Sequence, residues 1–196
     1  TAIEAGINYF DTAYPYHGGM SEIVVGKILK KYPRESYYIA DKFPGVDLSA
    51  FGRVEEIFEE QLQKVGGEYF DFYLFHCVCE NNIEQYLDEE KKYGTVEYLL
   101  EQKRQGKIGH LGFSAHAELE TMRRLLEKYG DVMYFVKMRE EGKIGHLGFS
   151  THANLENMRR FLDKYGKYME FGQIQLNWLD WDFQNAKTEM EIANRI

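Results

Sequence analysis

Apolar and polar residues alternate in several short runs along the chain, and longer stretches with a different spacing separate those runs. Alternation with a period of two is typical of β-strands, and it predicts strands over residues 7–12, 36–43, 69–76, 108–114, 144–150 and 171–177. Apolar residues three or four positions apart are typical of helices, and they predict helices over residues 21–32, 52–66, 95–105, 119–129, 131–141, 155–165 and 183–196. Strands that alternate with helices indicate parallel βαβ units, so we predict an α/β fold in a single domain that spans residues 1–196.

One segment of the chain occurs twice. Residues 93–128 recur as residues 129–164, an offset of 36 residues, and the alignment of 104–130 with 140–166 gives 20 identities in 27 positions. Two copies are fewer than a solenoid requires, so we interpret the repeat as a duplicated helix–strand–helix module. The near identity favours a recent duplication, a recombinant origin or a designed chimera over an ancient symmetric fold.

Polar side chains stand at or just beyond the carboxyl ends of the first three predicted strands. Asp11 ends the first strand and Tyr16 follows it in the loop. Lys42 ends the second strand, 31 residues after Asp11, and His76 ends the third, 34 residues after Lys42. Each interval matches one βα unit, and the carboxyl ends of the strands of a parallel barrel open on the same face. We therefore expect these four side chains to converge.

An acid, a phenol, an amine and an imidazole in one place have a defined chemistry. A free tyrosine titrates near pH 10, and a nearby lysine ammonium favours the phenolate and lowers that value. An aspartate beside the lysine keeps the ammonium charged and oriented, and a neutral histidine can donate a hydrogen bond to a substrate oxygen. The cluster is suited to protonate a carbonyl oxygen while hydride reaches the carbon.

Three stretches that carry these residues, "GINYFDTAYPYHGGMSE", "IADKF" and "YFDFYLFH", resemble the aldo-keto reductase family. Two more, "YPRESYYIADKFPG" and "QIQLNWLDW", are similar to the bacterial branch whose members often carry a C-terminal iron–sulfur segment. The resemblance implies a (β/α)8 TIM-barrel type of fold. It also implies that Asp11, Tyr16, Lys42 and His76 form the catalytic set, with motif spacing favouring Tyr16 over its neighbour Tyr14.

The same resemblance implies a nicotinamide cofactor, NADPH or NADH, and a small-molecule carbonyl substrate. Ser114 or Ser150, each within a "GFS" motif, and Gln173 match positions that hold the nicotinamide carboxamide, and Asn177 closes the same strand motif as Gln173. The implied reaction is hydride transfer from the cofactor to an aldehyde or ketone, with Tyr16 as the general acid.

The sequence also departs from the family's pattern. The family's first strand would precede residue 1 and its seventh and eighth strands, which grip the cofactor phosphates, would follow residue 196. We therefore expect a barrel truncated at both ends, incomplete or rearranged, with about six parallel strands, and we see no cysteine-rich segment for a cluster. Asp41 precedes Lys42 where threonine is common, and period-two alternation predicts that the Asp41 side chain points away from the site.

Composition narrows the range of partners and compartments. The net charge of −8 argues against nucleic-acid or anionic-membrane surfaces, and no apolar run approaches the ~18–20 residues of a membrane span. Cys77 and Cys79 are too close for an unstrained disulfide, which favours a reducing cytoplasm. Neither the "HCVC" run nor the repeated histidines have the pattern of a metal site, and we expect none.

Two alternatives to an active reductase remain open at this stage. The tandem copy and the truncation also fit a catalytically inactive barrel fragment or an engineered chimera of that family, and a non-catalytic interaction module is the least favoured interpretation. An open six-stranded sheet has two unpaired edges, which invite pairing between chains. We therefore expect a homodimer through exposed sheet edges.

Overall fold

The computed structural model describes residues 3–129, 148–150, 155–168, 171–173, 188 and 191–192. The chain divides into two compact units, Thr1–Thr121 and Met122–Ile196, which are described separately below.

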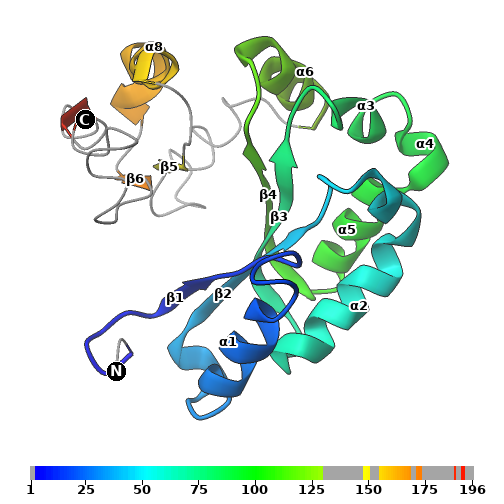
Figure 1. Cartoon of the computed structure of the whole chain (residues 1–196), viewed down its shortest axis with the longest axis vertical. Coiled ribbons are helices and arrows are strands. Elements are labelled where there is room, and N and C mark those ends of the chain that lie inside the picture. Colours follow the sequence, from blue (N-terminus) through cyan, green and yellow to red (C-terminus); the bar gives the residue numbers. More distant parts are fainter. Residues whose placement is uncertain are drawn as a thin grey trace. The chain divides into compact units, whose positions relative to one another are not determined.

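The first unit is built on a four-stranded parallel sheet in the order β1-β2-β3-β4 (Figure 1). The strands are β1 (Tyr9–Asp11), β2 (Tyr38–Phe43), β3 (Phe70–Val78) and β4 (Ile108–Ala115). Neighbours in the sheet are also neighbours in the sequence, and every pairing is parallel. The predicted parallel α/β architecture is confirmed, with strand ends that differ from the predicted ones by at most two residues.

Helices follow these strands in the predicted places. The longer ones are α1 (Ser21–Leu29), α2 (Val54–Val65), α5 (Thr95–Arg104) and α6 (Leu119–Tyr129). Four short pieces were not predicted: α3 (Ile83–Tyr86), α4 (Glu90–Tyr93) and two 3-10 segments, Arg34–Ser36 and Leu48–Arg53. Each spans too few residues for an apolar spacing to repeat, so no periodic signal marks it.

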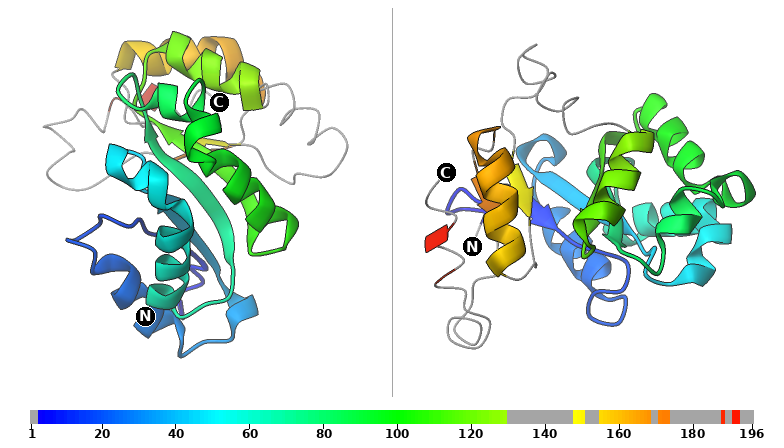
Figure 2. Two further views of the ribbon diagram at one scale, coloured as in Figure 1. Left: turned by 90° about the vertical axis from the view of Figure 1, so that its right-hand side faces the viewer. Right: turned by 90° about the horizontal axis from the view of Figure 1, so that it is seen from above.

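The core of the first unit lies between the sheet and the helices, where α2 and α5 run side by side (Figure 2). The Phe58 ring of α2 contacts Phe70 and Tyr73 of β3, with centroids 5.7 and 5.2 Å apart. Helices α1 and α2 meet at Gly26, where an added Cβ would stand 2.5 Å from the Val65 carbonyl oxygen. The helix layer is therefore fixed closely to β2 and β3, the strands that carry Lys42 and His76.

The second unit contains a two-stranded parallel sheet of β5 (Gly148–Ser150) and β6 (Phe171–Gln173). Between them lie α8 (Leu155–Tyr165), whose Met158 is buried, and the 3-10 segment Gly166–Tyr168. Both copies of the repeat thus contribute a strand, β4 from the first and β5 from the second. The helix predicted over 131–141 and Asn177 lie outside the described residues, as does most of the predicted helix over 183–196.

All six predicted strands are present at least in part, four in one sheet and two in the other. Within the described ranges these strands do not close into a barrel, in line with the incomplete architecture expected from the sequence. The edge strands of the larger sheet are β1 and β4. The homodimer through sheet edges stays a prediction.

Candidate active site

Three of the four predicted site residues lie at the carboxyl ends of adjacent strands. Asp11 is the last residue of β1, Lys42 is next to last in β2, and His76 is two residues from the end of β3. Alternation along β2 places Asp41 on the opposite side, where its carboxyl group is buried against Gln61 of α2. The predicted orientation of Asp41 away from the site is thus confirmed, and Lys42 faces away from the helix layer.

Lys42 is the centre of the cluster. Its ammonium donates hydrogen bonds to the Asp11 carboxylate and to the Thr12 carbonyl oxygen, the latter at 2.7 Å. The Lys42 side chain is 6% exposed, whereas the Asp11 side chain is 30% exposed. A buried ammonium needs such partners because the loss of its hydration is otherwise costly. The ion pair therefore fixes the charged group at one point on the sheet edge.

Tyr16 reaches the cluster from the loop that follows β1. This loop turns through His17, Gly18 and Gly19, which all have positive φ angles. The turn is closed by hydrogen bonds from the peptide N–H groups of Gly19 and Ser21 to the Tyr16 carbonyl oxygen. The Tyr16 ring centroid lies 4.8 Å from the Lys42 Nζ and 5.5 Å from the His76 ring centroid.

Tyr14, the alternative to Tyr16, is directed elsewhere. Its hydroxyl donates a 2.8 Å hydrogen bond to Glu60 of α2, and the Lys64 ammonium lies 4.0 Å from the centroid of its ring. Tyr14 therefore ties the loop to the helix layer, while Tyr16 contacts Lys42 and His76. The structure brings Asp11, Tyr16, Lys42 and His76 together.

The His76 imidazole is neutral at physiological pH. Burial, with smaller contributions from the Lys42 and His116 charges, lowers its pKa from 6.5 to about 4. Its Nδ1 atom is buried and has no hydrogen-bond partner among the described residues. A neutral imidazole carries one N–H donor and one acceptor nitrogen, so His76 is able to offer a hydrogen bond to a bound oxygen.

An irregularity in β3 shapes the backbone next to His76. The register between β3 and β4 shifts between Phe75 and Val78, and Cys77 within this bulge has a φ of 53°. The Cys77 peptide N–H donates a 2.9 Å hydrogen bond to the Ser114 hydroxyl oxygen of β4. Bulges re-aim side chains next to active sites, and this one lies directly after His76.

Asn82 holds the same bulge and was missed by the sequence analysis. Its buried amide donates to the carbonyl oxygens of Gly45 at 2.9 Å and Cys77 at 3.0 Å, and its oxygen accepts from the Cys79 N–H at 2.8 Å. It thereby joins the loop after β2 to the loop after β3. An asparagine in a polar loop carries no distinctive sequence signal, because its partners are backbone atoms of distant segments.

The candidate cofactor residues fall into three groups. Ser114 lies near the end of β4 in the first unit. Ser150 and Gln173 are register partners on β5 and β6 of the second unit. Asn177 lies outside the described residues.

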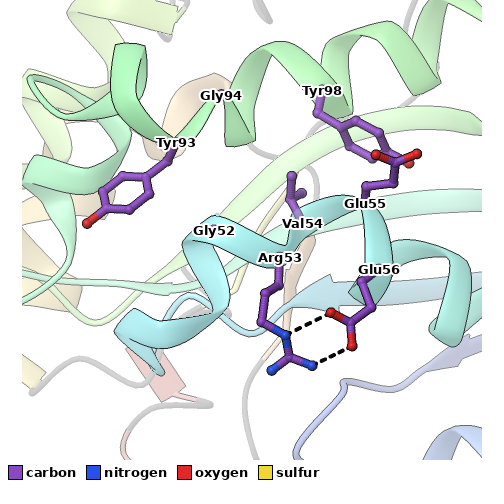
Figure 3. A pocket seen from close by; sticks show the side chains of 8 residues that line it. All are labelled: Gly52, Arg53, Val54, Glu55, Glu56, Tyr93, Gly94 and Tyr98. Atoms are coloured by element: carbon purple, nitrogen blue, oxygen red, sulfur yellow. Dashed lines mark hydrogen bonds and ion pairs between the residues drawn. The ribbon is translucent and has the colours of Figure 1, made fainter.

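A separate pocket lies between the N-terminal ends of α2 and α5 (Figure 3). It has a volume of about 530 Å³ and is lined by Gly52, Arg53, Val54, Glu55, Glu56, Tyr93, Gly94 and Tyr98, none of which belongs to the cluster around Lys42. The Arg53 guanidinium is held by Glu56 through two hydrogen bonds, and a Glu90 oxygen accepts from the first N–H groups of α5. Two charged residues of the pocket lining, Arg53 and Glu56, are therefore already paired with each other.

Two further properties of the described residues bear on other functions. No group of three or more histidine, cysteine, aspartate or glutamate side chains in these residues is arranged to hold a metal ion. None of the described helices has the length and apolar character needed to cross a membrane.

Comparison with proteins of known sequence identifies relatives of this chain. Probable aldo-keto reductase 1 of Glycine max is 34% identical over 132 residues, which is 63% of this chain and 35% of that protein. The NADH-specific methylglyoxal reductase of Escherichia coli (strain K12) is 34% identical over 147 residues, 65% of this chain and 43% of that protein. The chain thus spans about 35–43% of the length of these curated relatives.

Solved structures agree on the fold. An aldo-keto reductase, MGS-M4, from a Medee basin deep-sea metagenome library matches with a TM-score of 0.61 at 20% identity, over 93% of this chain and 58% of that one. The aldo/keto reductase from Klebsiella pneumoniae in complex with NADP and acetate matches with a TM-score of 0.54 at 18% identity, over 84% of this chain and 63% of that one. These likenesses show a TIM-barrel type of fold, part of which the described strands form.

The family itself is shown by a sequence model. The model of the Aldo/keto reductase family matches residues 1–136, more than half of the chain and all of the segment that carries Asp11, Tyr16, Lys42 and His76. This protein belongs to the aldo/keto reductase family of oxidoreductases.

Proposed function

We propose that this protein is a carbonyl reductase that uses NADPH or NADH, with Tyr16 as the general acid. The observation that carries the proposal is the position of the Lys42 ammonium, which bonds Asp11 on one side and lies 4.8 Å from the Tyr16 ring centroid on the other. The substrate class is an aldehyde or ketone, and the product is the corresponding alcohol.

The proton step depends on Tyr16 and Lys42. The Tyr16 hydroxyl donates its proton to the carbonyl oxygen as negative charge develops there, and the ammonium of Lys42 stabilises the negative charge left on the phenolic oxygen. Such electrostatic stabilisation is strong in a site with little water. Asp11 keeps the ammonium oriented through their ion pair. A nicotinamide cofactor, when bound, supplies the hydride that completes the reduction at the carbon.

His76 orients the carbonyl group in this proposal. Its imidazole stays neutral because burial lowers its pKa to about 4, so it donates a hydrogen bond without competing with Tyr16 as an acid. The edge-on contact of the two rings, with an 80° angle between their planes, supports a substrate position shared by Tyr16 and His76. A carbonyl oxygen at that position would receive two hydrogen bonds.

The cofactor residues of the proposal are Ser114, Ser150, Gln173 and Asn177. A carboxamide needs one donor and one acceptor, and Ser150 and Gln173, which are register partners on β5 and β6, are residue types that can supply both. Ser114 supports the site from β4, where its hydroxyl oxygen accepts a hydrogen bond from Cys77. The relatives fit both cofactor choices, since one is named as NADH-specific and one structure holds NADP.

The test has a binding step and a turnover step. Quenching of protein fluorescence is titrated with NADPH and NADH, and reduction of a small aldehyde is then followed by the loss of cofactor absorbance. We expect binding and turnover in the wild type, with turnover lost in Tyr16→Phe and retained in Tyr14→Phe, because the Tyr14 hydroxyl bonds Glu60 instead. A wild type that binds neither cofactor, or a Tyr16→Phe variant that is fully active, would refute the proposal.

A further inference from the structure

The backbone of Lys42 lies where β1 leaves β2. The ladder between the two strands ends at Asp11 and Ala40, and the last hydrogen bond on this edge runs from the Thr12 N–H to the Ala40 carbonyl oxygen at 2.9 Å. Every second residue of a strand bonds toward the same neighbour. The next peptide groups on that edge are therefore the N–H and C=O of Lys42, at the point where β1 has turned into the loop with Tyr16.

Two side chains replace the missing strand at this point. The Lys42 N–H donates a 2.8 Å hydrogen bond to the Asp41 carboxyl group, and the Lys42 carbonyl oxygen accepts a 3.1 Å hydrogen bond from the Gln61 amide. The Thr12 carbonyl oxygen, relieved of a ladder bond, accepts instead from the Lys42 ammonium at 2.7 Å. The backbone of Lys42 is thus hydrogen-bonded by the Asp41 and Gln61 side chains on the helix side of the sheet. Its ammonium is hydrogen-bonded by Asp11 and Thr12 on the other side.

These side chains belong to a fully buried polar cluster of Glu22, Asp41, Gln61 and Tyr73. The Gln61 amide nitrogen also lies 2.9 Å from oxygens of both Glu22 and Asp41, and the Tyr73 hydroxyl donates to the Gln61 amide oxygen. The two N–H groups of the Gln61 amide therefore serve three acceptor oxygens, those of Glu22, Asp41 and the Lys42 carbonyl group. A buried network of this kind is rigid when every member has a partner.

The charges around the two carboxyl groups do not balance unless one of them is neutral. Glu22 has the Lys64 ammonium 3.2 Å away, whereas the Lys42 ammonium is directed to the other face of the sheet. The second oxygen of Asp41 is buried and has no other partner among the described residues. Burial and the Glu22 charge raise the pKa of Asp41 well above its usual value, which favours a protonated Asp41 carboxyl group that can donate to Glu22.

We propose that Asp41 and Gln61 are positioning residues for Lys42, which hold its peptide where β1 departs so that its ammonium reaches both Asp11 and Tyr16. The catalytic meaning of this positioning rests on the proposed function, whereas the positioning itself is measurable without turnover. Asn at position 41 mimics the neutral acid, because its amide oxygen still accepts from Lys42 and Gln61 and its NH₂ group still donates to Glu22.

The first test measures how well Lys42 is held. The rate of its reductive methylation by formaldehyde and cyanoborohydride is compared, by peptide mass spectrometry, with that of the exposed Lys27 on α1. We expect Lys42 to react about tenfold faster in Asp41→Ala and in Gln61→Met, which each lose about one net hydrogen bond to the peptide, and to react at the wild-type rate in Asp41→Asn. If the cluster had only a structural role, Asp41→Ala would lower the stability of the protein but leave the ratio of the Lys42 and Lys27 labelling rates unchanged.

The outcomes separate cleanly. Unchanged labelling in folded Asp41→Ala and Gln61→Met, or equal acceleration in Asp41→Asn and Asp41→Ala, would overturn the proposal. If Asp41→Ala fails to fold, the labelling rate of Lys42 in Gln61→Met alone decides whether the peptide of Lys42 is held by these side chains.

A second measurement tests the protonation of Asp41. The infrared C=O band of a protonated carboxyl group at neutral pH should be present in the wild type and absent in Asp41→Asn, and a wild type without this band would refute a neutral Asp41. Neither measurement needs turnover, so an inactive wild type would remove the proposed function without touching this result.

Discussion

The ring of Tyr16 stands edge-on to the imidazole of His76, with the centroids 5.5 Å apart and the planes at 80°. Tyr16 comes from the loop after β1 and His76 from β3, so the two rings meet across β2, the strand that carries Lys42 between them. Convergence of a phenol, an imidazole and an ammonium from three consecutive βα units makes specific predictions about activity and stability.

Lys42→Met should lower carbonyl reduction by about a hundredfold or more, because proton transfer by a positioned acid contributes about 10²–10⁴ in rate and Tyr16 would lose the charge that supports it. The measurement is kcat with a saturating aldehyde, and Lys27→Met on the exposed side of α1 is the control. Equal activity of the two variants would contradict the role of Lys42.

The pH dependence of stability should contain a contribution from His76. The unfolded chain binds a proton on this imidazole below about pH 6.5, while the folded chain stays neutral down to its pKa of about 4. The unfolded state therefore binds more protons in this window, and stability falls as the pH falls from about 6.5 to 4. Urea denaturation at several pH values should show a smaller loss in His76→Phe than in the wild type.

The exposed His17 supplies the control for that experiment. Asparagine tolerates the positive φ of position 17, so His17→Asn should fold normally. This variant should lose as much stability as the wild type when the pH falls from about 6.5 to 4. A wild-type slope in His76→Phe would contradict the assignment to His76.

Asn82→Ala should lower the free energy of unfolding by about 2–3 kcal/mol, because backbone groups of Gly45, Cys77 and Cys79 would lose their partner inside the protein. Reduction should fall as well, since the bulge after His76 would no longer be fixed. The neighbouring and exposed Asn81→Ala is the matched control and should change little. Chemical denaturation of the two variants, followed by kcat, measures both effects.

Gly26→Ala should destabilise the protein by about 1–3 kcal/mol despite the higher helix propensity of alanine. The added Cβ would stand 2.5 Å from the Val65 carbonyl oxygen and 2.8 Å from that of Lys64, both rigid backbone atoms. At Gly52 an added Cβ would meet nothing within 4 Å, so Gly52→Ala should leave the melting temperature near that of the wild type. Equal melting temperatures for the two variants would show that α1 and α2 can separate at no cost.

Ser150→Ala should weaken cofactor binding more than Ser114→Ala, by about three- to tenfold in Kd for one lost hydrogen bond. Ser150 stands beside Gln173 in the β5–β6 register, whereas the Ser114 oxygen is used by Cys77. Fluorescence titration with NADPH distinguishes the two. A larger loss in Ser114→Ala would assign the carboxamide position to the first copy of the repeat.

Much of the fold was accessible from the sequence because its signals are local. Alternation located the four strands of the first unit within two residues of their ends, and it also placed Asp41 and Lys42 on opposite faces of β2. The convergence of the site residues followed from a second regularity, that Asp11, Lys42 and His76 stand one βα unit apart, with Tyr16 in the loop directly after Asp11. Both arguments need only spacing along the chain.

Asn82 and Gln61 could not be found in this way. Asn82 acts on the backbone of Gly45 and Cys77, and Gln61 acts on the carbonyl oxygen of Lys42, 19 residues earlier in the sequence. Their roles arise from tertiary proximity, and in the sequence they are an ordinary loop asparagine and an ordinary helical glutamine. The one-turn helices α3 and α4 were missed for a different reason, since four residues do not complete a recurring apolar pattern.

The repeated strand has a consequence for how the chain folds. The nine residues "GKIGHLGFS" occur in both copies, so two strands of nearly the same sequence can pair with β3. Their side chains favour neither pairing strongly over the other. The connection from β3 to the second copy is about twice as long as that to the first, and a doubling of loop length costs only ~0.6 kcal/mol. The pairing of β3 during folding is therefore a competition between two copies of one strand, biased toward β4 mainly by the shorter connection.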